Sequence, residues 1–419
     1  MGRKALTKWE LAAVRYFVLL RDNYAGYDPS GGDGRFSAAF RSLAEDLDRR
    51  GDSLDSTSFA RALADSLAFL SDGHFTIRGG DFSRSLGGQV YWYTTGEDWL
   101  LERRGSGFRF LSGPLAGADV APRMTAGDAT IMARPTIDRE GRVAWRLVAS
   151  RCLDEGESPV DLCLDVPVKR LGKTAGASIV FIVDDFCPSG GGEAWSISPT
   201  GYGRYAKYAT FMYVDDAGRT AQAAFADRLP ELRTAPVFVF DLRGNMGGHS
   251  DVIDAWIASF CGTTLPLCLY DLQTARDGRI ETADAAWRQL APHLDAMGML
   301  PRVKGPNKVL FILMDHYCCS STEDAIRELS ILDGALLVGM PTSGMLACGD
   351  NSWYRDEETG TGIFFGNNRR IWYPQDWRAL PEGQGIEPDL WVPTTYARER
   401  AEALVARYGD ETLSKTLRR

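Results

Sequence analysis

No stretch of the sequence is apolar over the roughly 18 residues that a membrane-spanning helix requires, so no membrane span is predicted. The chain also has no basic excess, because its 47 lysines and arginines face 56 aspartates and glutamates and leave a net charge of −9. This balance disfavours non-specific binding of nucleic acid. Residues 1–22 have only a short apolar centre, broken by Arg15, and therefore predict an amphipathic helix rather than a signal peptide.

Cysteine and histidine, which build disulfide and metal sites, are sparse. The eight cysteines never show the Cys-x-x-Cys spacing, so they support neither a disulfide framework nor a zinc site, and a reducing, cytoplasmic location is expected. Histidine occurs four times, at positions 74, 249, 293 and 316. A histidine that acts as a general base must be one of these four.

The first part of the chain predicts two regions of different texture. Residues 1–78 show three helical patterns and predict an N-terminal helical cap, and residues 79–176 show short alternating runs that predict a small β-rich domain. The three helices are expected at Trp9–Leu20, Phe36–Leu47 and Phe59–Leu70.

Residues 177–394 alternate strand-like and helical patterns, which predicts an α/β core with a mostly parallel sheet. Residues 395–419 predict a C-terminal helix. A helix is expected at Thr220–Leu232, and strands at Ser178–Asp184, Tyr208–Val214, Pro236–Phe240, Val309–Leu313, Gly334–Val338 and Ile363–Gly366.

Two strand ends in this core carry residues suited to acyl transfer. The stretch Lys308–Glu323, KVLFILMDHYCCSSTE, is a buried-strand pattern that passes into a helical one at Ser320. A serine at such a junction lies beside backbone N–H groups that no helical carbonyl accepts. The turn Asp241–Gly248, DLRGNMGG, ends another strand, and its Gly247 or Gly248 N–H is a candidate oxyanion donor. Each feature alone is weak, since Ser320 can simply cap a helix and a glycine turn can bind nothing.

The motifs FDLRGNMGG, VLFILMDHYCCSSTE, GALLVGMPTSG and GQGIEPD follow one another over residues 178–393, and SDGHF precedes them. In this order they resemble the tail-specific, C-terminal processing serine peptidases and their tricorn-core relatives. The resemblance implies a crotonase-like α/β core and assigns Ser320, three residues before Glu323, as the nucleophile. It also implies Ser321 N–H as the second oxyanion donor. For residues 79–176 it raises the expectation of a degenerate PDZ-like domain.

The general base departs from the common pattern of that family. The lysine expected 25 residues after the nucleophile is replaced by Met345, and no lysine occurs from residue 309 to 414. The tricorn-like branch implies instead His74 as the base and a downstream glutamate, here Glu382, that orients it. In tricorn a serine precedes this histidine, whereas this chain has Gly73, for which Asp72 is a candidate replacement.

Other residues remain open for several of these roles. His249 is the main rival base and His316 a weaker one, and His293 is remote from every motif. Glu387, Glu357, Glu358 and Asp389 compete with Glu382. We interpret Glu323 as a helix cap, Arg243 and Asn245 as braces of the glycine turn, and Cys318 and Cys319 as inert packing rather than nucleophiles.

The sequence therefore predicts a cytoplasmic serine peptidase that cleaves extended peptides or protein C-termini and needs no metal or cofactor. A non-catalytic peptide- or ligand-binding protein of the same fold is the first alternative, and an esterase or amidase for small substrates is the second. Self-association into a homo-oligomer is expected from the assemblies of the relatives.

Overall fold

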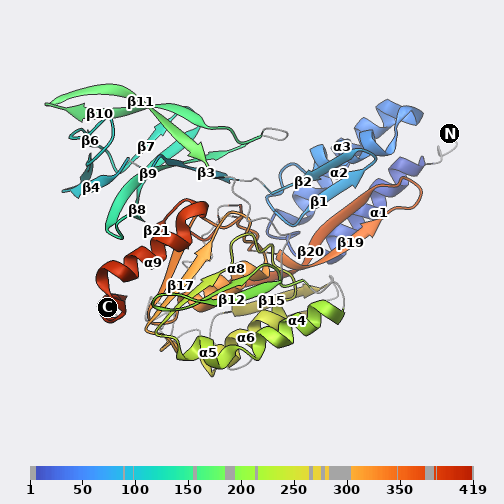
Figure 1. Ribbon diagram of the computed structural model, residues 1–419. Helices are drawn as coiled ribbons and strands as arrows, with labels where there is room; N and C mark the ends of the chain where they lie inside the picture. Colours follow the sequence, from blue (N-terminus) through green and yellow to red (C-terminus); the bar gives the residue numbers. More distant parts are fainter. Residues whose placement is uncertain are drawn as a thin grey trace. The chain divides into compact units, whose positions relative to one another are not determined.

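The computed structural model places the chain in two compact units, each built from separate stretches of sequence (Figure 1). The first unit comprises Met1–Gly88, Pro266–Met299 and Gly344–Gly383, and the second comprises Gln89–Leu265, Leu300–Ser343 and Gln384–Arg419. The structure describes residues 6–87, 90–97, 99–153, 158–184, 194–212, 216–263, 268–274, 279–282, 303–346, 348–372, 382–383 and 385–417. None of the helices in these ranges combines the length and the apolar character needed to cross a membrane.

The first unit packs three helices with an antiparallel sheet. Thr7 caps the first helix through a capping box with Glu10, and Asp55 caps the third with Ser58. The helices lie in the region where the sequence pattern predicts them, at α1 (Lys8–Asn23), α2 (Gly32–Arg50) and α3 (Ser56–Ser66), with a short 3-10 turn η1 (Gly51–Ser53) between the last two.

The sheet of the first unit draws its strands from distant parts of the chain. Its order is β16-β15-β20-β1-β2, with β19 also paired to β20. The strands are β1 (Thr76–Gly79), β2 (Phe82–Ser85), β15 (Cys268–Thr274), β16 (Arg279–Thr282), β19 (Cys348–Arg355) and β20 (Gly362–Trp372). The strand predicted at Ile363–Gly366 is thus present, but it lies in this antiparallel sheet and not in the parallel core.

A second antiparallel sheet forms the β-rich part of the second unit. Because β3 pairs with both β11 and β9, the path β3-β11-β10-β6-β5-β4-β9 closes into a ring, and β8 and β7 continue from β9. The strands are β3 (Val90–Thr95), β4 (Leu101–Arg104), β5 (Gly107–Phe110), β6 (Asp119–Val120), β7 (Arg123–Ala126), β8 (Ala129–Ile137), β9 (Val143–Cys152), β10 (Leu162–Arg170) and β11 (Lys173–Val183). The described part of residues 90–183 contains no helix, so it offers no groove between a strand and a helix of the PDZ kind.

Strand β11 corrects one prediction. The apolar run Ser178–Asp184 was expected to be a buried strand of the α/β core, yet it belongs to the antiparallel ring and pairs with β10 and β3. Its side chains alternate between the two faces, with Phe181 buried and Val180 and Ile182 about half exposed. An apolar run alone does not distinguish a doubly buried strand from one with an exposed apolar face.

The core sheet of the second unit has the order β12-β13-β14-β17-β18-β21, and every pair except β12–β13 is parallel. The mostly parallel sheet predicted from the sequence is therefore present. Its strands are β12 (Trp195–Pro199), β13 (Gly203–Tyr208), β14 (Val237–Asp241), β17 (Val309–Met314), β18 (Ala335–Gly339) and β21 (Leu390–Trp391). The β13 strand ends at Tyr208, the first residue of the predicted Tyr208–Val214, and residues 213–214 of that prediction lie outside the described part.

Helices cover both faces of this core sheet, and Figure 1 shows α5 and α6 on one side and α9 on the other. Val237, Val239 and Phe311 pack with α9, whereas Phe238 and Phe240 turn to the opposite face and contact rings of α6. The helices are α4 (Asp216–Ala226), α5 (Leu229–Thr234), α6 (Ser250–Cys261), α8 (Ser321–Ser330), the 3-10 turn η3 (Thr394–Tyr396), α9 (Ala397–Tyr408) and α10 (Asp410–Leu417). Two predicted helices are each divided in two: Thr220–Leu232 into α4 and α5, and the C-terminal one into α9 and α10.

Candidate active site

The two predicted turns meet at one edge of the core sheet. Strands β14 and β17 are parallel neighbours, with Asp241 opposite Leu313, so the segments that follow them leave the sheet side by side. Asp315 joins the segments, because its Oδ1 accepts from the Gly244 N–H at 3.0 Å and from the Tyr317 N–H at 3.1 Å. Burial raises the pKa of Asp315 to about 6.

Ser320 has a backbone conformation that few residues other than glycine adopt. Its φ is 56° and its ψ is −128°, and it immediately precedes α8. Such a conformation costs about 1–3 kcal/mol and is typical of functional turns, including the strand-to-helix turn that exposes a serine nucleophile. The side chain is half-buried, and the serine is thus placed at a helix N-terminus without being enclosed in the core.

The glycine turn lies in direct contact with Ser320. A Cβ on Gly247, which has a φ of 87°, would lie 3.1 Å from Ser320 Cβ and 3.1 Å from the Ser321 nitrogen. The Ser321 hydroxyl also donates to the Gly248 carbonyl at 3.1 Å. The structure therefore brings together four residues that the sequence analysis singled out: Gly247, Gly248, Ser320 and Ser321.

The two glycines differ in the use of their N–H groups. The Gly247 N–H donates to Asn245 Oδ1 at 2.9 Å and is buried, so it is already engaged within the turn. Gly248 is exposed and has a φ of 140°. Ser321 occupies the first position of α8, where an N–H has no intrahelical acceptor. Of the two glycines, Gly248 is thus the candidate oxyanion donor beside Ser321.

The polar side chains of the glycine turn hold its shape, as predicted. Arg243 donates to Asp241 through Nε at 2.8 Å and Nη2 at 2.5 Å, and through Nη1 to the Thr394 carbonyl. Asn245 donates to the Tyr208 carbonyl at 3.0 Å and also accepts from the Thr322 hydroxyl at 2.8 Å. The charge and hydrogen bonds of Asp241 raise the pKa of Arg243 despite its burial.

Glu323 has the structural role that its spacing predicts. Its carboxylate accepts from the Ser320 N–H at 3.1 Å and from the Thr342 hydroxyl. The Ser320 carbonyl in turn accepts from the Glu323 N–H at 2.8 Å. These bonds fix the turn that carries Ser320.

The neighbouring cysteines are unsuited to be nucleophiles. Cys318 donates its thiol to the Leu242 carbonyl and Cys319 donates its thiol to the Met246 carbonyl, both at 3.1 Å. Burial raises the pKa of Cys319 to about 12 and holds the pKa of Cys318 well above its usual value. Both therefore remain protonated thiols near neutral pH, in agreement with their interpretation as packing.

The first unit brings His74 together with two carboxylates. Ligand atoms of Asp72, His74 and Glu382 all lie within 4.8 Å of one another, and His74 is only 7% exposed. The Asp72 Oδ1 accepts from the His74 N–H at 2.9 Å and lies 4.0 Å from His74 Nδ1. Two of the predicted catalytic residues, His74 and Glu382, are thus neighbours although they are far apart in the sequence.

Each carboxylate of this group is itself held in place. Tyr24 donates its hydroxyl to Asp72 Oδ2 at 2.9 Å, and burial, reinforced by the Asp72 charge, raises the pKa of Tyr24 so that it stays a donor. Glu382 accepts from the Gly73 N–H at 3.4 Å and from the Leu346 N–H at 3.2 Å. Sequence analysis did not identify Tyr24, because a tyrosine just after α1 and 48 residues before Asp72 carries no local signal.

Met345, at the position of the family's lysine, packs beside the histidine segment. A Cβ on Gly73 would lie 2.6 Å from Met345 Cγ. The serine that precedes the histidine in tricorn therefore has no room in this chain. Met345 therefore packs against the glycine of this segment, and its role as an apolar filler stays a prediction.

The rival residues are not members of the group formed by Asp72, His74 and Glu382. His249 is the N-cap residue of α6, and His316 contacts the rings of Tyr91 and Tyr317. Glu387 pairs with Arg134, Glu358 with Arg15, and Asp389 accepts from the Leu337 N–H. Glu357 is exposed, and His293 lies outside the described residues.

Asp72, His74 and Glu382 are also the residues that could hold a cation, as one imidazole and two carboxylates are a common ligand set. However, both carboxylates already accept hydrogen bonds from the Tyr24 hydroxyl or from backbone N–H groups. Carboxylates held in this way are suited to orienting the ring and stabilising its protonated form.

Comparison with known proteins identifies the segment that carries the serine. Residues 190–392 match the model of peptidase family S41. A search of curated proteins finds no match. Among solved structures, mature CPAF aligns with a TM-score of 0.49 and 14% identity over 98% of this chain and 96% of its own. The tricorn protease aligns with a TM-score of 0.42 and 12% identity over 98% of this chain and 37% of its own. The photosystem II D1 C-terminal processing protease aligns with a TM-score of 0.39 and 15% identity over 99% of this chain and 98% of its own. The family match contains Ser320, the glycine turn and Glu382, and it begins well after His74.

Proposed function

Because residues 190–392 belong to peptidase family S41, we propose that this chain is a serine peptidase whose nucleophile is Ser320 and whose base is His74. The peptidase assignment follows from the family, in agreement with the motifs of the sequence. We infer in addition that the core has the crotonase-like topology of that family. The substrate is an extended peptide or a protein C-terminus.

In the first half of the proposed reaction, the Ser320 oxygen attacks the carbonyl carbon of the scissile peptide while His74 takes the hydroxyl proton. The negative charge that develops on the carbonyl oxygen is stabilised by the N–H groups of Gly248 and Ser321, aided by the positive end of α8. The protonated imidazole then donates its proton to the leaving amine. Ser320 is left as an ester of the substrate.

Water completes the cycle by the same route. His74 takes a proton from water, which attacks the ester, and returns the proton to the Ser320 oxygen as the acid product leaves. Glu382, together with Asp72, orients the imidazole and stabilises it while it is protonated.

One observation carries the proposal: Ser320 has a strained backbone at a helix N-terminus and lies against Gly247, where an added Cβ would be 3.1 Å from the Ser320 Cβ. A serine that only capped α8 would have no need of this conformation, since residues that cap helices adopt extended backbone.

Labelling by a fluorophosphonate, followed by peptide mapping, tests the assignment. Modification is expected at Ser320 in the wild type and is expected to be absent in Ser320→Ala. It should be at least about 10³-fold slower in His74→Ala, because the hydroxyl then lacks its base. Ser330→Ala, on the same helix, is the matched control and should label at the wild-type rate. Labelling confined to cysteines, or unchanged by Ser320→Ala, would contradict the proposal.

The same experiment separates the alternatives. A non-catalytic binder would not be labelled, and an esterase or amidase would be labelled but would cleave only small acyl substrates. The six cysteines that the structure describes as free thiols support our inference of a reducing, cytoplasmic environment. Homo-oligomerisation remains a prediction.

A further inference from the structure

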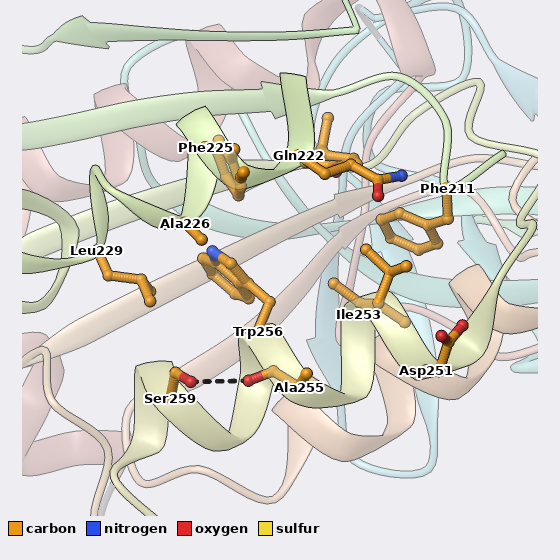
Figure 2. A pocket seen from close by; sticks show the side chains of 13 residues that line it. Phe211, Gln222, Phe225, Ala226, Leu229, Asp251, Ile253, Ala255, Trp256 and Ser259 are labelled. Carbon is orange, nitrogen blue, oxygen red and sulfur yellow. Dashed lines mark hydrogen bonds between the residues drawn. The ribbon is translucent and has the colours of Figure 1, made fainter. Parts of the chain in front are cut away.

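A pocket of about 480 Å³ lies between α4 and α6 on one face of the core sheet (Figure 2). This volume is within the range of small-ligand sites. Its walls are mostly apolar and include the large side chains of Phe211, Phe225, Leu229, Ile253 and Trp256. Sequence analysis gave no indication of it, because the lining is shared among three helices, the end of β13 and Phe211.

The pocket is continuous with the glycine turn. The Phe211 N–H donates to the Gly247 carbonyl, and the Phe211 carbonyl accepts from the His249 N–H, both at 3.0 Å. A Cβ on Gly248 would lie 2.3 Å from the Phe211 carbonyl carbon. The wall of the pocket is therefore bonded directly to the segment that carries the candidate oxyanion donor.

Trp256 gives the pocket a polar group without a protein partner. The residue is only 6% exposed, and its Nε1 has no acceptor among the described residues. In Figure 2 the nitrogen edge of the indole is turned toward α4, which carries Phe225 and Ala226. A buried N–H without an acceptor is destabilising, so a native protein that keeps one has reason to bind an acceptor there.

The ring of Trp256 cannot easily turn to find another partner. It stacks on Phe260 with centroids 5.0 Å apart and an interplanar angle of 9°, and on Phe225 at 5.3 Å and 24°. It also contacts Phe240 at 5.1 Å. The indole N–H is thus a fixed donor in an aromatic pocket.

We propose that this pocket is a substrate subsite for a tyrosine side chain, with the phenol oxygen accepting from Trp256 Nε1. This inference rests on the proposed function, because it places a residue of the peptide beside the glycine turn. Asp251 is the one charged residue that lines the pocket, and its negative charge offers no partner to a buried anion. The acceptor is therefore a neutral group.

The position of the donor also favours tyrosine. Trp256 lies within α6, six residues or about 9 Å along the helix after Ser250, and not at the glycine turn, so a long side chain is favoured over serine or threonine. The aromatic walls favour a ring over the flexible chain of glutamine or methionine. Tyrosine combines length, a ring and an acceptor at the tip.

Binding of p-cresol, which represents the tyrosine side chain, tests the subsite without any need for catalysis. In full-length Ser320→Ala protein, p-cresol should bind about tenfold more tightly than toluene, because only p-cresol has an acceptor. The indole ¹H–¹⁵N signal that is lost in Trp256→Phe should be the one that p-cresol shifts. Trp256→Phe should remove the preference for p-cresol and leave the affinity for toluene unchanged, whereas Trp353→Phe, an exposed control, should leave both unchanged.

A second variant guards against a general effect of Trp256→Phe on folding. Ala226 lines the pocket but is exposed, so Ala226→Trp should block p-cresol while the melting temperature stays near that of the parent. Equal affinity for p-cresol and toluene, or binding that survives Ala226→Trp, would overturn the subsite. With peptides, Trp256→Phe should abolish a kcat/KM preference for tyrosine over phenylalanine. If the wild type is not labelled by a fluorophosphonate but p-cresol binds as expected, the peptidase mechanism is rejected and the pocket is not.

Discussion

Ser320 adopts a backbone conformation that destabilises the folded chain and that a glycine would accept freely. The strain is concentrated at one residue, because the bonds from Glu323 and the contact with Gly247 determine the turn from both sides. A substitution at position 320 that relieves the strain should therefore raise stability while it lowers activity.

Ser320→Gly is expected to raise the free energy of unfolding by about 1 kcal/mol and to lower peptide hydrolysis by about 10⁴-fold or more. Ser320→Ala should be equally inactive but should lack the stabilisation, because alanine retains a Cβ at positive φ. Urea unfolding of the three proteins measures the difference. Equal stability of the two variants would show that the turn is unstrained.

Gly73 has no side chain at the place where the side chain of Met345 packs against the backbone. Gly73→Ser should destabilise the protein by about 1–3 kcal/mol, because the new Cβ would lie 2.6 Å from Met345 Cγ. The double variant Gly73→Ser, Met345→Ala should recover most of this loss relative to Met345→Ala alone. A thermal melt of the four proteins gives the coupling. Additive effects of the two substitutions would reject the steric explanation.

At the scale of elements, α6 and α8 bring the carboxyl groups of Asp254 and Glu328 near each other. Burial, reinforced by the charge of Asp254, raises the pKa of Glu328 to about 8. The raised value means that the folded state holds the proton more tightly than the unfolded state, in which the pKa is near 4.5. Stability from this group is therefore greatest at low pH and is lost as the pH rises toward and through 8.

The wild type should lose roughly 2–3 kcal/mol more stability than Glu328→Gln between pH 6 and pH 9, since glutamine does not titrate. Denaturant unfolding at a series of pH values measures the difference between the two proteins. Asp254→Asn is the matched control and should move the loss to lower pH, because it removes the neighbouring charge. A difference that is constant from pH 6 to 9 would contradict the assignment.

The elements also show what the sequence could predict about the site. Strands β14 and β17, and the roles of Glu323, Arg243 and Asn245, follow from local patterns, because each is decided by neighbours within a few residues. The choice between Gly247 and Gly248 as donor did not follow, since it depends on Asn245 turning its side chain back onto the chain. Tyr24 and Trp256 were missed because their partners are distant in sequence. The exposed face of β11 was missed because an apolar run does not show whether one or both of its faces are covered.

At the scale of the whole molecule, the helices of the N-terminal region are part of a larger unit and not a separate cap. Tyr16 donates its hydroxyl to the Thr361 carbonyl, and the Ala25 N–H donates to the Gly366 carbonyl at 3.1 Å. Ile363 and Phe365 of β20 are buried in the same core as α1 and α3. Sequence order alone divided this unit between two predicted regions.

Removal of residues 1–88 should therefore leave β19 and β20 without their packing partners. The shortened chain is expected to bind a hydrophobic dye strongly and to be cut by protease within residues 348–372, which the intact protein should resist. Removal of residues 1–5 only, which precede the Thr7 cap of α1, is the control and should have neither effect. A shortened chain that resisted cleavage would show that the sheet stands without the helices.

The hydrogen bond between the Gly73 N–H and Glu382 spans 309 positions of the sequence. During synthesis at about 5–20 residues per second, Glu382 is added roughly 15–60 s after the histidine segment. Ser320 is also made before Glu382, so in the proposed mechanism the nascent chain carries its nucleophile and its base for some seconds without the carboxylate that orients the base. The synthesis of Glu382 after both residues thus delays the completion of the proposed site.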